Sequence, residues 1–148
     1  MSDETSARQL VVFTLGGERY ALPIEQVHEI ISYEEPRSVA SPHAWVRGVI
    51  SLRGRIVAVY DLAARLGLQA SDQAASKIVI VESNDEIAGV VVDDVEEVIT
   101  ITEAAFEDVP GSDSEMVDSI VKHGDELVVL LKPPAILNIL NTSSQQAV

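Results

Sequence analysis

The side chains of this sequence best suited to catalysis or metal binding are its histidines and its pairs of adjacent carboxylates. His28, His43 and His123 lie far apart, and none belongs to an HExxH motif or a comparable metal-ligand spacing. The sequence also lacks a phosphate-binding glycine loop, a dinucleotide fingerprint and the GxSxG motif of serine hydrolases. A catalytic centre of any of these kinds is therefore not predicted.

Two acidic pairs are the best candidates for a metal site or an acid–base pair, namely Asp93-Asp94 and Glu96-Glu97. Their surroundings are typical of a strand, in which adjacent side chains point to opposite faces. Neither pair is then able to converge on one site, and a solvated acidic surface is the favoured interpretation. A small metal-dependent hydrolase that uses Asp93, Asp94 or His123 is kept as an alternative of another class. No cofactor is expected.

Arg53 and Trp45 are the side chains best suited to contact another protein. Arg53 lies at a predicted turn between two apolar segments, in the stretch GVISLRGR. Its five donors can tie loop carbonyls together, or its planar fork can receive an acidic or backbone group of a partner. Trp45 is interpreted mainly as a core or interface anchor, with partner contact as the alternative. The sequence leaves these interpretations open.

The composition predicts a cytoplasmic, β-rich protein. Hydrophobic residues make up 47% of the 148 residues and aromatic residues only 4%, so Val, Ile, Leu and Ala must form the core. The absence of cysteine excludes a disulfide framework and a thiolate nucleophile. The N-terminus is polar, and no apolar stretch approaches the about 18 residues that a membrane helix needs.

Charge is unevenly distributed along the chain. The net charge is −14, and the segment 82–118 contains many carboxylates but no Lys or Arg. The segment 37–65 contains one acid, Asp61, and five arginines: Arg37, Arg47, Arg53, Arg55 and Arg65. This basic segment is explained equally well as ordinary surface or as a contact patch for an acidic partner. The acidic second half argues against nucleic acid and anionic lipid as partners.

The sequence contains an internal repeat. At a shift of 68 positions, residues 9–31 align with residues 77–99, and at a shift of 70 positions, residues 50–62 align with residues 120–132. Each half therefore reads as a hairpin, an acid-rich apolar segment, a loop, a second hairpin and a short helix. Because a unit of about 60 residues is marginal alone, the two halves are expected to share a core and leave a groove at their seam.

Local signals predict where strands and helices end. Turns are expected where residues that tolerate positive φ interrupt apolar runs: Gly16-Gly17, Arg53-Gly54, Asn84-Asp85 and His123-Gly124-Asp125. Asp61 is predicted to cap a short helix that ends at Gly67. A final helix is predicted over 134–140, after Pro133. Over 23–31 the apolar residues have helical spacing, but the matching segment of the second half, 91–99, is typical of a strand. The sequence leaves both structures open for this segment.

These predictions give one domain over 8–142. The first half, 9–68, is expected to form the first barrel, and the second half, 77–140, the second barrel. A linker at 69–76 joins the halves, and flexible tails are expected at 1–7 and 143–148.

Short motifs follow one another in a fixed order from about Gln9 to Leu140. They are VFTLG (12–16) with YALPI (20–24), VHEI (27–30), VRGVISLRG (46–54), VYDL (59–62) and GVVVD (89–93). This ordered set resembles the CheW family, the coupling proteins of bacterial and archaeal chemotaxis. The resemblance implies a mainly β fold of two small five-stranded β-barrels on a common hydrophobic core, with short helices including one at the C-terminus.

The resemblance also implies a non-catalytic adaptor. Such a protein links the cytoplasmic tips of methyl-accepting chemoreceptors to the histidine kinase CheA, and helps to build receptor arrays at the membrane. The groove between the barrels is expected to take the receptor tip, with Val27 and Glu29 near the groove and Arg53 as the characteristic arginine of the family.

The regulatory domain of the kinase is expected near the loop 33–38, near Arg47 and near 107–112. The candidate contacts are Tyr33, Pro36, Arg47 and Glu107. Weak self-association in rings is a further expectation.

Three departures from the family pattern leave the identity of the partners open. Ser51 stands where Asn is usual, Ala58 replaces a common proline, and residues 118–119 replace a glycine. An adaptor in a chemotaxis-like pathway that controls pili or gene expression is therefore an alternative. A small barrel that binds nucleic acid is a weaker one, because the net charge is −14.

Overall fold

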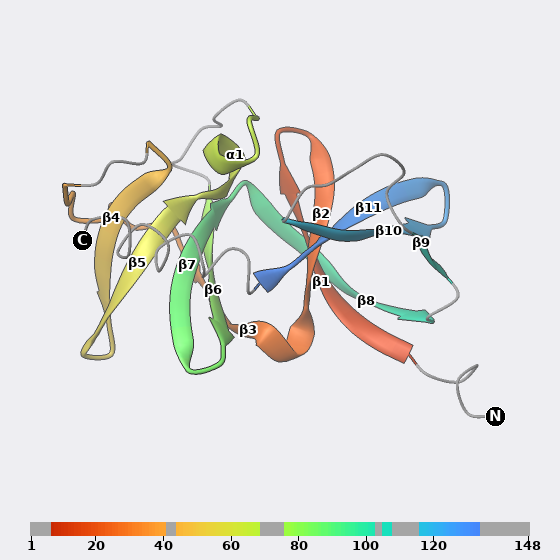
Figure 1. Cartoon of the computed structure of the whole chain (residues 1–148), viewed down its shortest axis with the longest axis horizontal. Helices are drawn as coiled ribbons and strands as arrows, with labels where there is room; N and C mark the ends of the chain where they lie inside the picture. The colour runs from red at the N-terminus through yellow and green to blue at the C-terminus, as the bar shows by residue number, and fades with distance from the viewer. Residues whose placement is uncertain (1–6, 41–43, 69–75, 103–104, 108–115, 134–148) are drawn as a thin grey trace.

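A computed structural model provides the fold, and the structure describes residues 7–40, 44–68, 76–102, 105–107 and 116–133. Within these residues the chain forms two β-sheets and two short helical segments (Figure 1). The mainly β prediction is confirmed.

The first sheet forms a lobe that contains the first and last strands of the described chain, and we call it the terminal lobe. Its strand order is β8-β1-β2-β11-β10-β9, and only β2 and β11 run parallel. The strands are β1 (Ala7–Leu15), β2 (Glu18–Pro23), β8 (Asp94–Thr102), β9 (Phe106–Glu107), β10 (Val117–His123) and β11 (Glu126–Leu131).

The second sheet forms the central lobe, on the left in Figure 1. Its order is β3-β6-β7-β5-β4, and only β5 and β7 run parallel. The strands are β3 (Val27–Ser32), β4 (Val46–Leu52), β5 (Arg55–Asp61), β6 (Lys77–Ser83) and β7 (Glu86–Val92). In the central lobe the edge strand β3 is followed in the chain by β4 at the opposite edge. In the terminal lobe the edge strand β8 is likewise followed by β9 at the opposite edge. Arg37 bridges Val49 of β4, and β9 pairs with β10.

The lobes do not coincide with the two sequence halves. β3 to β7 are consecutive and form the central lobe, whereas the terminal lobe combines β1 and β2 with β8 to β11. The third strand of each repeat pairs with the first strand of the other repeat, β3 with β6 and β8 with β1. The halves 9–68 and 77–140 therefore do not form one barrel each. The segment 69–76 falls between two strands of the central lobe.

The repeat itself is present in the strand pairing. The pairing of β3 with β6 shifts between Val27 and Glu29, and the pairing of β1 with β8 shifts at the equivalent place, between Val95 and Glu97. The second alignment needs a correction by one residue. Leu52 flanks the β4–β5 turn as His123 flanks the β10–β11 turn, which is a shift of 71. Gly124 consequently matches Arg53, because both residues take the first, positive-φ position of the turn.

The predicted turns and the cap at α1 are confirmed. Positive φ angles occur at Gly16, Gly17, Arg53, Gly54, Asn84, Asp85 and Gly124. Asp61 Oδ1 accepts the N–H of Ala64 at 3.1 Å and caps α1 (Leu62–Arg65), and Gly67 follows with a φ of 79°.

Two other local predictions have different outcomes. The ambiguous segment 23–31 divides into a short 3-10 turn, η2 (Ile24–Gln26), and the strand β3. The predicted C-terminal helix over 134–140, the tail over 143–148 and the first six residues lie outside the described residues.

The hydrophobic core has three parts. One cluster fills the terminal lobe and includes Leu10, Val12 and Leu130, and another fills the central lobe and includes Ile50 and Ile80. The third cluster lies between the lobes and takes buried residues from both: Phe13, Leu15, Leu22, Met116 and Leu131 from the terminal lobe, and Tyr60, Val79, Val81, Ala88 and Val90 from the central lobe. The expected shared core is thus confirmed. No helix in the described part of the chain is long and apolar enough to cross a membrane.

Candidate protein-interaction surfaces

The structure brings together two of the three residues predicted for the receptor groove. Arg53 occupies the turn after β4 with a φ of 51°, and its Nη1 donates to Oε1 of Glu29 on β3. Since β3 and β4 are the two edges of the central sheet, this ion pair joins the edges. The Arg53 side chain is 71% exposed and that of Glu29 is 22% exposed. The guanidinium is therefore accessible to a partner.

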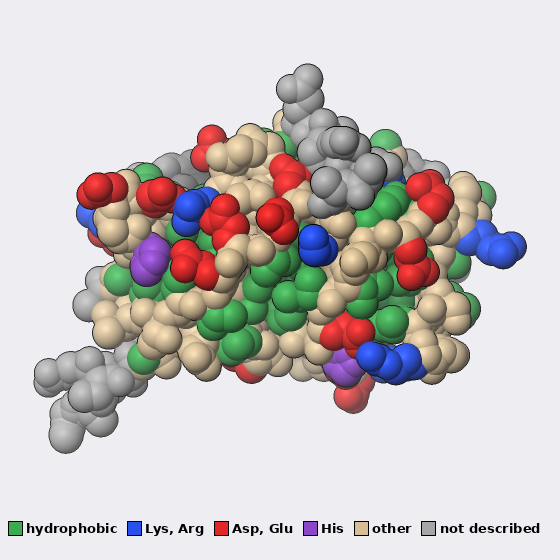
Figure 2. Space-filling view, turned by 180° about the vertical axis from the view of Figure 1, so that it is seen from behind, with side chains coloured by type: hydrophobic (Ala, Val, Ile, Leu, Met, Phe, Trp, Pro, Cys, Tyr) green, Lys and Arg blue, Asp and Glu red, His purple; other side chains and the backbone are tan. Residues whose placement is uncertain are grey.

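Val27, the third predicted groove residue, lies on the same strand as Glu29 and is partly buried against the interlobe cluster. Its repeat counterpart in the terminal lobe, Val95, packs on the same cluster. Figure 2 shows hydrophobic side chains gathered in a band across the middle of the rear face, with charged side chains around it. Val27 and Val95 thus contribute one apolar side chain from each lobe to the seam.

Trp45 also belongs to the interlobe region. Its ring is partly buried against the interlobe cluster, and the guanidinium of Arg65 lies 5.2 Å from the ring centroid. This position agrees with its interpretation as an anchor.

The loop 33–38 is fixed to the central sheet by its backbone. The amides of Arg37 and Val49 exchange hydrogen bonds of 2.8 and 2.9 Å with the opposite carbonyls. This bridge requires Gly48, because a Cβ there would lie 2.1 Å from the Arg37 carbonyl oxygen. Pro36 is buried, so its side chain anchors the loop and is not presented to a partner.

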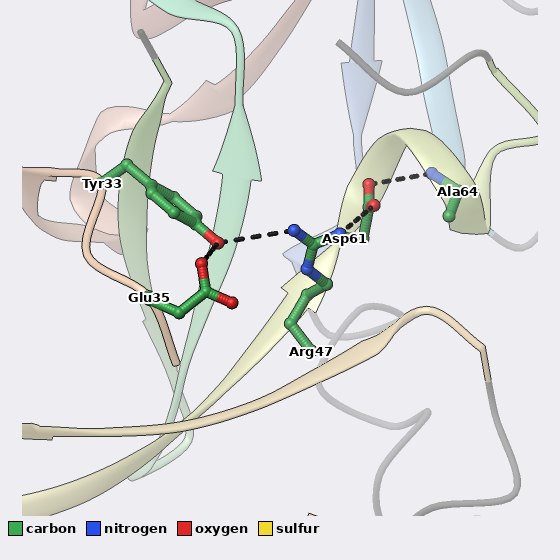
Figure 3. Close-up of polar contacts among 5 residues, drawn as sticks. All are labelled: Tyr33, Glu35, Arg47, Asp61 and Ala64. Carbon is green, nitrogen blue, oxygen red and sulfur yellow. Dashed lines mark hydrogen bonds and ion pairs between the residues drawn. The ribbon is translucent and has the colours of Figure 1, made fainter. Parts of the chain in front are cut away.

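A chain of polar contacts connects this loop with α1 (Figure 3). Arg47 Nη1 donates to Asp61 Oδ2 at 3.1 Å, and Arg47 Nη2 donates to the Tyr33 hydroxyl at 3.4 Å. Tyr33 donates to Glu35 Oε1 at 3.1 Å. The side chains of Arg47 and Asp61 are only 22% and 13% exposed. Arg47 is therefore mostly enclosed by its own protein.

Glu107 is exposed on β9 of the terminal lobe, and its Oε2 lies 3.1 Å from the Lys122 ammonium. β9 pairs with β10 through Glu107 and Ile120, as Arg37 pairs with Val49. The shift of 71 relates Val49 to Ile120, so Arg37 and Glu107 hold equivalent positions. The regions predicted to bind the kinase thus lie on equivalent edges of the two lobes, where the matching residues Arg37 and Glu107 carry opposite charge.

Comparison with known proteins identifies the family. The model of the CheW-like domain matches residues 9–141. The chain belongs to the CheW family.

Individual proteins agree with this assignment. The chain is 31% identical to the chemotaxis protein CheW of Bacillus subtilis (strain 168), over 97% of this chain and 94% of that protein. The crystal structure of the scaffolding protein TtCheW from Thermoanaerobacter tengcongensis superposes with a TM-score of 0.81 and 34% identity, covering 86% of this chain and 90% of that one. The protein PilI of Pseudomonas aeruginosa is 35% identical, over 56% of this chain and 47% of its own length.

The residues of the hydrolase alternative have structural contacts in this CheW-family fold. Asp93 Oδ2 accepts the N–H of Gly16 at 2.9 Å, and Asp94 lies 3.7 Å from the Lys77 ammonium. His123 ends β10 opposite Glu126. Among the residues that the structure describes, no group of three or more His, Asp or Glu side chains is placed to hold a metal ion.

Glu96 and Glu97 on β8 contact the same arginine, so the expectation that this pair does not converge on one site is wrong. The strict alternation of faces is interrupted here because the pairing of β8 with β1 skips Glu96. Arg19 Nη1 lies 3.2 Å from Glu96 and 3.8 Å from Glu97, and its Nε lies 2.5 Å from Glu126. The pair thus belongs to an ion-pair network on the terminal lobe.

The link between Arg47 and Asp61 is a structural feature that the sequence does not predict, although one signal was present. Asp61 is the only acid in the basic segment 37–65, so an arginine of that segment was a reasonable partner for it.

The sequence also did not predict the environment of Tyr60, the residue before Asp61. It is buried between the lobes, and its hydroxyl has no hydrogen-bond partner in the described structure. Burial, with a smaller contribution from Glu86, raises the pKa of Tyr60 to about 12.

Proposed function

We propose that this chain is a non-catalytic adaptor that couples methyl-accepting chemoreceptors to the histidine kinase CheA and helps to assemble receptor arrays. The observation that carries the proposal is the family match over residues 9–141, together with the TM-score of 0.81 to a scaffolding protein. The adaptor works in the cytoplasm, recruited to the membrane by the receptors, and needs no cofactor.

The receptor tip binds at the seam, beside Val27, Glu29 and Arg53. The support for this assignment is the exposed guanidinium of Arg53, its ion pair with Glu29, and the position of Val27 against the interlobe cluster. The contact with Glu29 uses Nη1 of Arg53, and a guanidinium carries five donors. Because the Arg53 side chain is 71% exposed, it is able to bind an acidic or carbonyl group of the receptor while it keeps Glu29.

The kinase regulatory domain binds at the lobe edges that carry the loop 33–38 and Glu107. These edges are equivalent in the internal repeat, and their exposed residues Arg37 and Glu107 differ in charge. Two edges of one molecule allow it to bridge two neighbours, which is what an array scaffold requires. Weak association between copies of the adaptor uses the same property.

The test is capture of purified chain by a CheA regulatory domain and by a receptor signalling-tip fragment from the same cell. Both fragments are expected to bind. Arg53→Glu is expected to weaken receptor binding by a few kcal/mol and to leave kinase binding unchanged. Arg55→Glu is the matched control, because Arg55 is an exposed arginine of the same hairpin.

The outcomes separate the possibilities. Failure of the wild-type chain to bind either fragment would refute the chemotaxis adaptor. A lower melting temperature of Arg53→Glu with unchanged receptor affinity would make Arg53 a structural residue instead.

A pathway that controls pili is the second candidate, and the similarity to PilI favours it. The same capture experiment, made with the receptor and kinase fragments of a pilus pathway, decides between the two outputs.

A further inference from the structure

The loop 33–37 is fixed at three points although most of its side chains are exposed. The N–H of Tyr33 donates to the Ser76 carbonyl at 3.2 Å, Pro36 is buried, and Arg37 is bridged to Val49. The backbone between these points therefore presents its side chains from a defined frame.

Glu35 is the exposed side chain that this frame holds in one orientation. The Tyr33 hydroxyl donates to its Oε1 at 3.1 Å, while its other oxygen points away from Tyr33 (Figure 3). Its neighbour Glu34 is also an exposed carboxylate, which makes the two residues a matched pair for comparison.

Arg47 contacts the other side of the Tyr33 hydroxyl. The carboxylate of Glu35 only accepts, so the hydroxyl proton is donated to Glu35. A guanidinium only donates, so Arg47 Nη2 uses a lone pair of the same oxygen and helps to hold the hydroxyl in place. Asp61 in turn holds the guanidinium through Arg47 Nη1 at 3.1 Å. The sequence of contacts from Asp61 to Glu35 is therefore directional.

We propose that Glu35 contacts a cationic side chain of the kinase regulatory domain, and that Tyr33 and Arg47 are positioning residues that fix its carboxylate. This inference rests on the proposed adaptor function. Hydrogen bonds between ionised partners are stronger than neutral ones, and a carboxylate accepts the fork of an arginine. Because Glu35 is already oriented, binding orders fewer side-chain rotamers and loses less affinity.

The contacts of Glu35 and Tyr33 are poorly explained by stability alone. Glu35 is exposed, and a hydrogen bond at the surface competes with water and adds little to folding. The enclosed position of Arg47 between Asp61 and Tyr33 also separates it from a direct role in binding.

The experiment measures the Kd of the intact chain for the CheA regulatory domain. Glu35→Gln is expected to weaken binding about tenfold, since a charge-assisted hydrogen bond is lost. Glu34→Gln, the matched control, is expected to change the Kd less than twofold. Tyr33→Phe is expected to weaken binding about threefold, because the carboxylate must then be ordered on binding.

A double variant provides the readout that a merely structural role would not move. Tyr33→Phe is expected to have no further effect in a chain that already carries Glu35→Gln, because Tyr33 acts through Glu35. Arg47→Lys, which retains a donor, is expected to bind more tightly than Arg47→Met. The melting temperature and the affinity for the receptor tip are measured for every variant as controls for folding.

Failure of the wild-type chain to bind the kinase domain would refute the adaptor function itself. Binding by the wild type with an unchanged Kd for Glu35→Gln would refute only the contact at Glu35. Additive effects of Tyr33→Phe and Glu35→Gln would refute the positioning role.

Discussion

Gly48→Ala tests whether the loop 33–38 depends on the close approach of two backbones. An added Cβ would lie 2.1 Å from the Arg37 carbonyl oxygen, where at least 3.0 Å is needed, so the loop must retreat by about 1 Å. That movement breaks the two hydrogen bonds between Arg37 and Val49, each with a net value of about 1 kcal/mol. The φ of 142° adds about 2 kcal/mol of strain for a residue with a Cβ.

The expected loss is therefore about 4 kcal/mol of the free energy of unfolding. Gly124→Ala is the control, because Gly124 also has a positive φ but no atom within 4 Å of the added Cβ. It is expected to lose about 1 kcal/mol. Since 1 kcal/mol lowers the Tm of a domain of this size by about 4 °C, the two variants should differ by about 12 °C.

The assay is thermal unfolding followed by circular dichroism, combined with hydrogen exchange at the amides of Arg37 and Val49. Both amides should lose protection in Gly48→Ala and retain it in Gly124→Ala. Equal melting temperatures for the two variants, with the Arg37 amide still protected, would refute the steric reasoning.

Two further predictions concern the core. Gly89→Ala should destabilise the central lobe by about 1–3 kcal/mol in chemical denaturation, because the added Cβ would lie 2.8 Å from Ile78 Cγ2; an unchanged midpoint would contradict this packing. Tyr60→Phe should leave stability at neutral pH unchanged or higher, because it removes a buried hydroxyl without a partner. The folded-state pKa of Tyr60, about 12, exceeds the ordinary 10.0, so the unfolded chain loses this proton first. The stability of the wild type is therefore unaffected by this ionisation below pH 10 and falls as the pH rises from 10 through 12. Tyr60→Phe should lack that alkaline loss, and identical pH profiles of unfolding would count against the buried tyrosine.

The parts of the fold that depend on local chemistry were predictable from the sequence. Asp61 caps α1 because its side chain reaches the amide of Ala64 three residues on, and such a contact needs no distant partner. Asn84 and Asp85 form a turn with positive φ because these side chains tolerate the left-handed region. The internal repeat also carried enough signal to predict two similar lobes.

Strand partnership was not predictable in the same way. β3 was expected to remain with its own half, yet it pairs with β6, and β8 pairs with β1. Both arrangements satisfy the same pattern of apolar residues, because the repeat makes β1 and β6 alike at the face that they offer. The register of the last hairpin was also predicted one residue away, since a shared glycine was used to align turns in which Gly124 matches Arg53.

The candidate site was also predicted only in part. The resemblance to the CheW family assigned Glu29 and Arg53 to one groove, and the structure joins them in an ion pair. The sequence did not separate exposed loop residues from anchors, so Pro36 was expected at a contact and is buried. Burial of a loop residue depends on the packing of distant strands, and one sequence does not report that packing. The partner contacts themselves stay predictions.

The discontinuity of the terminal lobe determines the order in which the protein can be completed during synthesis. Every strand of the central lobe has left the ribosome once β7 has emerged, so that lobe can fold while the rest of the chain is still being made. The hairpin of β1 and β2 must wait for β8 on one edge and for β11 on the other. At about 5–20 residues per second, this wait lasts roughly 5–20 s. For that time two unpaired strand edges are open to aggregation or chaperones, and the nascent chain becomes resistant only when its last strand closes the lobe that its first strand began.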